Sequence, residues 1–230
     1  MKKHLLIILI SISISTFSQK KINNQNKIIS KMNTVTFDNE MRKLTDKYFD
    51  EDNQENSNLN KLISIARDIE KLALKMPKND QGFYKAADYY TRLGLFVDSS
   101  RNWEKLILFK NTNYDDLNVY YLNLAESYVL SNQYLKCIEV ENNFNKINDI
   151  KKKDSDRLAF EFLKLLASFS LNKNINEQKE EFLMNLKTTI FPRNWNFSYM
   201  KDSIEKIDFP ENQKLFFFEI IKEIENIRGY

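Results

Sequence analysis

Apolar residues recur every three or four positions through most of the chain after residue 35, and this spacing constrains the fold more than any other feature of the sequence. In one stretch the recurring residues are Leu117, Tyr121, Leu124 and Tyr128. The spacing places them on one face of an α-helix. Outside the first residues of the chain, no segment keeps the strict alternation that predicts a strand. We therefore predict an all-α fold, with about ten helices between residues 36 and 228.

Residues that interrupt helices are rare and fall where the apolar spacing stops. Glycine and proline number three each among 230 residues. Pro77, Pro192 and Pro210 lie at predicted helix boundaries, where proline removes no internal hydrogen bond. The polar, asparagine-rich run at residues 50–60 predicts a loop. Short polar loops between helices favour antiparallel neighbours.

The first 18 residues have the pattern of a secretory signal peptide. Lys2 and Lys3 precede a short apolar run, and the small residues Thr16 and Ser18 follow it. A retained membrane anchor is the alternative, but it needs about 20 apolar residues, more than this run provides. Residues 19–34 are polar and aperiodic, so we expect a flexible leader there. After removal of the signal peptide we expect no membrane span.

A pattern of aromatic and small residues occurs three times, at offsets of 38 and 41 residues. A small residue lets two helices approach closely, and the aromatic residues fill the space beside them. Glycine at the turn position permits the positive φ that ends a helix. The copies are Phe83, Ala86, Ala87, Tyr90, Gly94, Phe96; Tyr121, Leu124, Ala125, Tyr128, Asn132, Tyr134; and Phe162, Leu165, Leu166, Phe169, Lys173, Ile175.

This pattern resembles the tetratricopeptide repeat (TPR) family, in which aromatic, small, tyrosine and glycine residues follow in this order. Trp103 and Leu106 also lie where the second helix of that family carries Phe and Ala, and Cys137 lies at its small position. The chain departs from the family in two respects. Gly94 alone supplies the turn glycine, and the offsets exceed the family's period of about 34 residues.

The resemblance covers residues 80–190, and further helical pairs are predicted at 36–76 and 194–228. It implies one TPR-like repeat domain over residues 35–230, an α-solenoid of about five antiparallel helical hairpins. The alternative is a helical bundle without a true repeat, because any chain of helical hairpins produces similar patterns.

The resemblance also implies where a partner would bind. In the family, the first helix of each pair faces a concave groove. Asp88 and Glu126 lie where the family's clamp for a peptide carboxylate places lysine and asparagine, so the resemblance implies a basic or mixed partner. The positions that correspond to the groove are Tyr84, Asp88 and Thr91; Leu122, Asn123, Glu126 and Val129; and Leu163 and Lys164.

Most kinds of catalytic and metal chemistry lack the residues they need. His4, in the predicted signal peptide, is the only histidine, so the mature chain has no imidazole base for a Ser or Cys nucleophile. Cys137 is the single cysteine and lies in an apolar stripe, which predicts a buried side chain. A calcium-like run at residues 50–54 fails because Glu55 stands where the loop needs glycine. We predict no cofactor and no metal.

The charges exclude a nucleic-acid footprint. Without Lys2 and Lys3 the chain has 33 basic and 32 acidic residues, mixed along its length. Nucleic-acid surfaces instead need clustered Lys and Arg. We therefore expect no nucleic-acid partner.

The function predicted from these features is an exported, non-enzymatic module that binds another protein. The compartment would be the periplasm if the source is a Gram-negative bacterium. Small size, export and the absence of catalytic groups suggest, more narrowly, an immunity protein that neutralises a secreted toxin.

Two alternatives remain open. One is a scaffold of an envelope complex that docks through an exposed face at Phe216–Phe218. The other is a glycan hydrolase that works through two carboxylates alone. Its sugar platform would be Trp103 or Trp195, the two tryptophans of the chain.

Overall fold

The chain is all-α throughout the part that the structure describes. The computed structural model describes residues 33–76, 80–108, 114–146, 154–192 and 195–228. These segments contain ten α-helices and no strand. The helices are α2 (Thr34–Asp52), α3 (Leu59–Lys75), α4 (Asp80–Arg92), α5 (Phe96–Ile107), α6 (Tyr114–Leu130), α7 (Tyr134–Asn145), α8 (Asp154–Ser170), α9 (Asn176–Thr188), α10 (Phe197–Lys206) and α11 (Glu211–Arg228).

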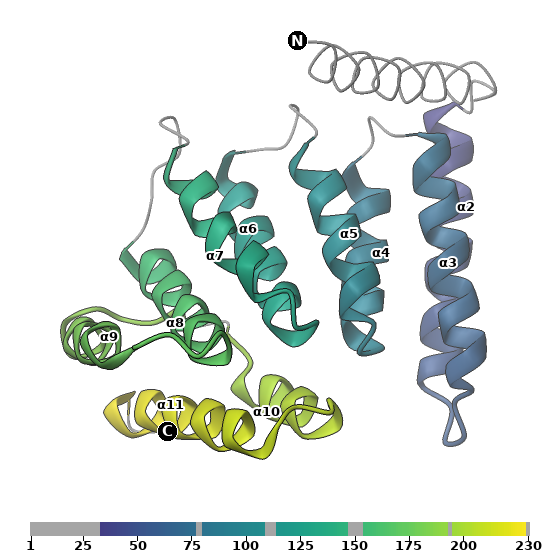
Figure 1. Cartoon of the computed structure of the whole chain (residues 1–230). Helices are drawn as coiled ribbons and strands as arrows, with labels where there is room; N and C mark the ends of the chain where they lie inside the picture. The colour runs from purple at the N-terminus through teal and green to yellow at the C-terminus, as the bar shows by residue number, and fades with distance from the viewer. Residues whose placement is uncertain (1–32, 77–79, 109–113, 147–153, 193–194, 229–230) are drawn as a thin grey trace, which may run out of the picture.

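Consecutive helices pack as pairs, and the last pair is placed differently from the others. Helices α2–α7 stand side by side, each packed on the next, and α8 packs on both α6 and α7 (Figure 1). The α10–α11 pair runs across the ends of earlier helices instead of continuing their row (Figure 1). Helix α11 packs on α8 and α9, and Lys179 on α9 lies 2.6 Å from Glu219 on α11.

Asparagine starts three of these helices. The side-chain oxygens of Asn33, Asn58 and Asn196 accept hydrogen bonds from backbone N–H groups in the first turns of α2, α3 and α10. Such caps satisfy N–H groups that have no partner inside the helix. Helix α2 therefore begins at Thr34, two residues before the predicted start at residue 36. The loop predicted at 50–60 is shorter than expected, because α2 continues to Asp52 and α3 begins at Leu59.

Helices α4, α6 and α8, each the first helix of its pair, end in the same left-handed turn. Gly94, Asn132 and Asn172 have φ of 71°, 61° and 55°. At each turn the next residue donates its N–H to a carbonyl five residues earlier, as in Leu95 to Tyr90 at 2.8 Å. The third turn was predicted at Lys173. The structure places it at Asn172, because asparagine tolerates a positive φ better than lysine does.

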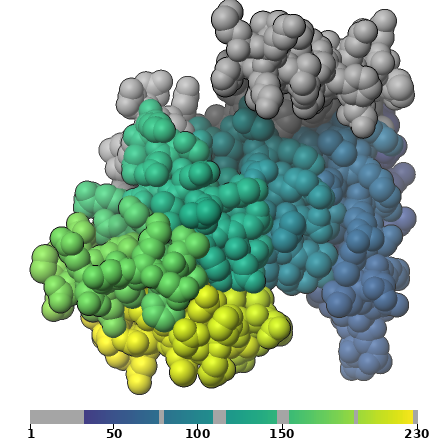
Figure 2. Space-filling view, viewed as in Figure 1, coloured from purple at the N-terminus to yellow at the C-terminus, as the bar shows by residue number. Residues whose placement is uncertain are grey.

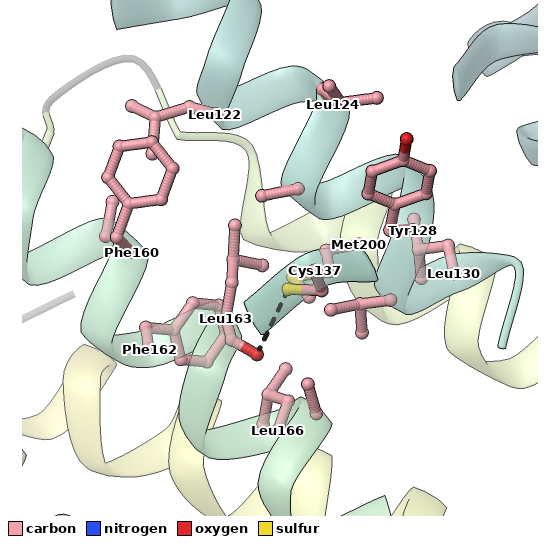
Figure 3. Close-up of a cluster of buried hydrophobic side chains, with 14 of the residues drawn as sticks. Leu122, Leu124, Tyr128, Leu130, Cys137, Phe160, Phe162, Leu163, Leu166 and Met200 are labelled. Carbon is pink, nitrogen blue, oxygen red and sulfur yellow. Dashed lines mark hydrogen bonds between the residues drawn. The ribbon is translucent and has the colours of Figure 1, made fainter. Parts of the chain in front are cut away.

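The repeat residues form the core. Ala86, Ala87 and Ala125 are fully buried, as expected for positions where helices approach closely. One apolar cluster joins α2, α3 and α4, and a larger one runs from α3 and α4 to α11. Cys137 is buried in the larger cluster, as predicted, and its thiol donates to the Leu163 carbonyl (Figure 3).

The face predicted at Phe216–Phe218 is not an exposed surface. Phe217 is fully buried, and the Phe216 ring stacks on Phe169 with ring centroids 3.9 Å apart. Phe218 is half-buried against the core. All three positions are covered because α11 packs on α8 and α9, a contact that the apolar stripe alone does not reveal.

Two predictions about the ends of the chain lie largely outside the described residues. The signal peptide at 1–18 and nearly all of the leader at 19–34 fall there. Among the helices that the structure describes, none combines the length and the apolar character that crossing a membrane requires.

Candidate protein-binding surface

Two of the three groove residues predicted on the first helix of the repeat lie close to its end. Asp88 and Thr91 are half-buried on α4, and Asp88 pairs with Arg92 at 3.0 Å. Tyr84, two turns earlier on the same helix, is 42% exposed and contacts the rings of Trp103 and Tyr120. The predicted face of α4 is therefore accessible over most of its length.

Helix α10 contributes an unexpected residue to this face. The Tyr199 hydroxyl donates a hydrogen bond to the Thr91 carbonyl, although the two residues are 108 positions apart in the chain. Burial, with a smaller effect from the charges of Glu126 and Asp88, raises the pKa of Tyr199 to about 12, against the lowering effects of Ser203 and Arg92. We call Asp88, Thr91, Arg92, Glu126 and Tyr199 the α4–α6–α10 surface.

Glu126 is the least compensated charge on this surface. Its side chain is half-buried on α6 and, within the described residues, makes no hydrogen bond or ion pair. Burial raises the pKa of this carboxyl from 4.5 to about 7. A carboxylate without a partner costs free energy that a cation brought by another molecule would recover.

Helix α2 packs on α4 through stacked aromatic rings that belong to the core, and only Phe49 among them is exposed. Tyr48 and Tyr89 stack with centroids 4.0 Å apart, and Phe49 meets Tyr89 edge-on while remaining 40% exposed. Burial raises the pKa of Tyr48, and the charges of Asp52 and Asp88 raise it further, against a lowering effect of Arg92. Acidic groups therefore outnumber the basic ones around these rings.

The outline of the molecule is hollowed between its first and last helical pairs. Figure 2 shows an open notch between the blue end of the α2–α3 pair and the yellow α10–α11 pair.

A small polar ladder holds the helices beneath the surface. The Thr91 hydroxyl lies 2.6 Å from that of Ser99, and the Ser99 hydroxyl lies 3.2 Å from that of Ser127. Both the Thr91 and Ser99 hydroxyls also lie within hydrogen-bond distance of the Ala87 carbonyl, at 2.9 and 3.0 Å. These contacts join α4, α5 and α6 where their backbones are close. The sequence predicted that Thr91 contacts a binding partner, and it did not reveal that the Thr91 hydroxyl joins helices within the protein.

Of the other five predicted groove residues, two are partly exposed and three are buried. Asn123 is half-buried on α6, and Lys164 on α8 pairs with Glu141 on α7 at 2.9 Å. Three apolar residues are core residues instead, because α6 and α8 are covered on more sides than the first helix of a regular repeat would be. They are Leu122, Val129 and Leu163.

A second repeating contact, not predicted, joins neighbouring pairs. Glu70 on α3 accepts hydrogen bonds from Tyr90 on α4 and from Arg101 and Lys105 on α5, at 2.8–3.2 Å. Burial raises the pKa of Glu70, but the hydrogen bonds and positive charges of its partners outweigh that effect and hold it below the usual range. Tyr90, the second aromatic residue of the first copy, is therefore a hydrogen-bond donor to the preceding pair.

The next pair repeats this acid–tyrosine–base contact. Glu104 on α5 accepts from Tyr128 on α6 and from Lys136 on α7. Tyr90 and Tyr128 occupy equivalent positions of the sequence repeat, so the internal repeat is also a repeat of contacts. The sequence signal that could have revealed this contact is an acidic residue on the preceding helix, at a similar distance along the chain before each tyrosine.

Groups that support chemistry are scarce in the described residues. No cluster of three metal-binding side chains lies among them. Burial raises the pKa of the Cys137 thiol, which disfavours the reactive thiolate. Trp103 is buried, and Trp195 is half-buried against Phe162 and Phe191.

Comparison of the chain with protein-family models, curated proteins and solved structures finds no match. The likeness to TPR proteins therefore depends on the repeat residues and on the packing of consecutive helices.

Proposed function

We propose that this chain is an exported, non-enzymatic, TPR-like module that binds another protein through the α4–α6–α10 surface. The observation that carries the proposal is Glu126, a half-buried carboxylate without a partner in the described residues, whose charge acts on Tyr199 together with that of Asp88. The side-by-side packing of α2–α7 and the repeated tyrosine contacts support the TPR-like interpretation for that part of the chain. Export rests on the signal-peptide pattern of residues 1–18.

The partner should present lysine or arginine next to an apolar group. Asp88 and Glu126 offer negative charge, whereas Arg92 is already paired with Asp88. The exposed edge of Phe49 offers apolar and aromatic contact nearby. Such mixed surfaces are typical of protein interfaces, where charge complementarity sets specificity and association rate. An immunity protein that covers a basic toxin surface is one form of this function.

The two rival functions receive less support from the structure. A glycan-binding platform needs an exposed aromatic face, and both tryptophans pack against other rings. The scaffold hypothesis relied on an exposed Phe216, which stacks on Phe169 instead.

Affinity capture tests the proposal. The full chain with a C-terminal tag, produced in the native host so that its own signal peptide directs export, should retain one stoichiometric partner from the envelope fraction. Asp88→Lys and Glu126→Lys should reduce recovery at least tenfold, because each places a positive charge against a basic partner. Asp38→Lys, at an exposed position on α2, makes the same charge change and should have no effect.

The variants need a check of folding, which circular dichroism and melting temperature provide. Equal recovery with all three folded variants would place binding elsewhere, and the absence of any partner would contradict a binding function. For the immunity form, deletion of the gene should sensitise cells to a toxin encoded beside it, and unchanged resistance to every such toxin would exclude that form.

A further inference from the structure

The last turns of α2 carry an exposed aromatic ring between two carboxylates. Phe49 is 40% exposed, and its ring meets those of Tyr48 and Tyr89 edge-on. Asp46 and Asp52 lie three residues before and three residues after Phe49, so they flank the ring on one side of the helix, and both are exposed. We call Asp46, Phe49 and Asp52 the Phe49 face.

The negative charge of this face is not balanced within the described residues. Neither Asp46 nor Asp52 forms an ion pair or a hydrogen bond there. Residues 46–55 include five acidic residues and one basic residue, Lys47. The C-terminal end of a helix adds partial negative charge of its own. A cationic side chain bound here would therefore be stabilised.

The cations of the neighbouring helices are engaged elsewhere. Arg92 on α4 pairs with Asp88, and Lys61 on α3 pairs with Glu51. The outer side of α2 is also open, because among the described helices α2 packs chiefly on α3. A ligand for the Phe49 face should therefore bring its own positive charge, together with an apolar group for the exposed ring.

The residues that follow the predicted signal peptide have this chemistry. Residues 19–32, which we call the basic leader, contain four lysines and no acidic residue, and isoleucine or methionine directly follows three of the lysines. From residue 34 onward the chain has 29 basic and 32 acidic residues. The basic leader lies outside the part of the chain that the structure describes. Its charge is thus opposite to that of the helical domain it precedes.

Chain geometry allows the basic leader to reach the Phe49 face of its own molecule. Phe49 lies 15 residues after Thr34, which is about 22 Å along α2 at 1.5 Å per residue. A coil of 12 residues, the separation in sequence between Ile22 and Thr34, has a root-mean-square end-to-end distance of about 17–21 Å. Effective concentration is greatest when the length of a linker matches the span, so binding within one molecule is favoured over binding to a second copy.

We propose that the basic leader folds back along α2 and binds the Phe49 face through Lys21 and Ile22. The lysine would lie between the two carboxylates and the isoleucine against the exposed ring. A basic partner that uses the edge of Phe49 would then compete with the basic leader. That competition rests on the proposed function, whereas the contact itself does not.

Disulfide formation between two introduced cysteines tests the contact. The full chain, exported by its native host, would carry Ile22→Cys with Asn53→Cys, which adjoins Phe49 on the same side of α2. The matched control is Ile22→Cys with Lys47→Cys, also exposed and near the end of α2 but on the opposite side of the helix. Equilibration of the purified protein in glutathione buffers gives the effective concentration of each pair. Cys137 does not interfere, because its thiol is buried.

We expect the effective concentration to be about tenfold higher for the pair at positions 22 and 53 than for the pair at positions 22 and 47. Adding Asp52→Lys to the first pair should lower it about fivefold, because attraction becomes repulsion, and combining Asp52→Lys with Lys21→Glu should restore it. Asp38→Lys makes the same charge change at an exposed position in the first turns of α2 and should have no effect.

Three results would overturn the contact. They are equal effective concentrations for the two pairs, no effect of Asp52→Lys, and disulfide-linked dimers in place of an internal disulfide, which would show that the basic leader binds a second copy. Failure to capture any partner, with the tenfold preference intact, would instead count against the proposed function alone.

Discussion

At the scale of single residues, the turns that end the first helices of the pairs show which structural features can be predicted from the local sequence. Gly94 and Asn132 were predicted as turn residues because they follow the second aromatic residue of each copy at the same distance. The third turn lies one position earlier than the alignment places it. Asn172, and not Lys173, adopts the positive φ. The prediction was wrong because it aligned the apolar residues of the copies and ignored the backbone preference of asparagine.

Gly94 gives the first residue-scale prediction. A Cβ at this position would meet no atom within 4 Å, so Gly94→Ala tests backbone strain without a clash. We expect a loss of about 1 kcal/mol in the free energy of unfolding, measured by urea titration. Asn132→Gly is the matched control and should be neutral or slightly stabilising, because glycine adopts the same φ without strain. Equal stability of Gly94→Ala and the wild type would show that the turn does not require a positive φ.

Cys137 gives the second residue-scale prediction. Burial raises the pKa of its thiol, and the side chain is enclosed by the larger core cluster. A chromogenic disulfide reagent at pH 8 should therefore leave the folded protein unmodified for hours and modify one thiol promptly after denaturation in guanidinium. Rapid modification of the folded chain would mean that Cys137 is accessible, contrary to the packing described above.

At the scale of helices, the contacts between pairs explain why the repeat tyrosines matter. Periodicity predicted that Tyr90 and Tyr128 face the neighbouring helices, which is correct. It did not predict that their hydroxyls bind Glu70 and Glu104. Thirty-two acidic residues are spread along the chain, and an acid meets its partner only through the packing of one pair on the next.

A double-mutant cycle measures the contact between pairs. Glu70 and Lys105 lie 2.8 Å apart and are both partly buried. Glu70→Gln, Lys105→Met and the double variant should show a coupling energy of about 1 kcal/mol at pH 7 in urea unfolding. Because the pKa of Glu70 is held below its usual range, its stabilising contribution is present at neutral pH and is lost as the pH falls through that lowered pKa. The same coupling at pH 2.5, where the carboxyl is neutral, would contradict an ionic origin.

At the scale of the whole molecule, the position of α10–α11 is the feature that sequence reasoning missed. The five consecutive pairs of described helices follow from local periodicity and turn chemistry. The last pair, however, crosses the ends of earlier helices and brings Tyr199 to Thr91 over 108 positions of sequence. No local pattern encodes such a contact, because it depends on the accumulated geometry of every turn between the two residues. The candidate site was therefore predicted on α4, α6 and α8 but not on α10.

The stacking of Phe216 on Phe169 should anchor this arrangement. Phe216→Ala removes a buried ring between α8 and α11, and we expect a loss of about 3–4 kcal/mol in the free energy of unfolding. Leu215→Ala, at a neighbouring position that is 62% exposed, should cost less than about 0.5 kcal/mol. Similar losses in the two variants, measured by thermal unfolding, would mean that α11 does not pack on α8 as described.

The central claim is that a protein partner docks on one face of the molecule, and site-specific photocrosslinking in the native host tests it most directly. A benzophenone side chain would replace Tyr84 or Asn123, on the face of α4 and α6 that carries Asp88 and Glu126. The controls are Leu135 on α7 and Met184 on α9, two exposed residues of second helices. We predict one crosslinked adduct of the same mass from positions 84 and 123 and none from positions 135 and 184. An adduct from the second helices alone, or none from any position, would contradict the account.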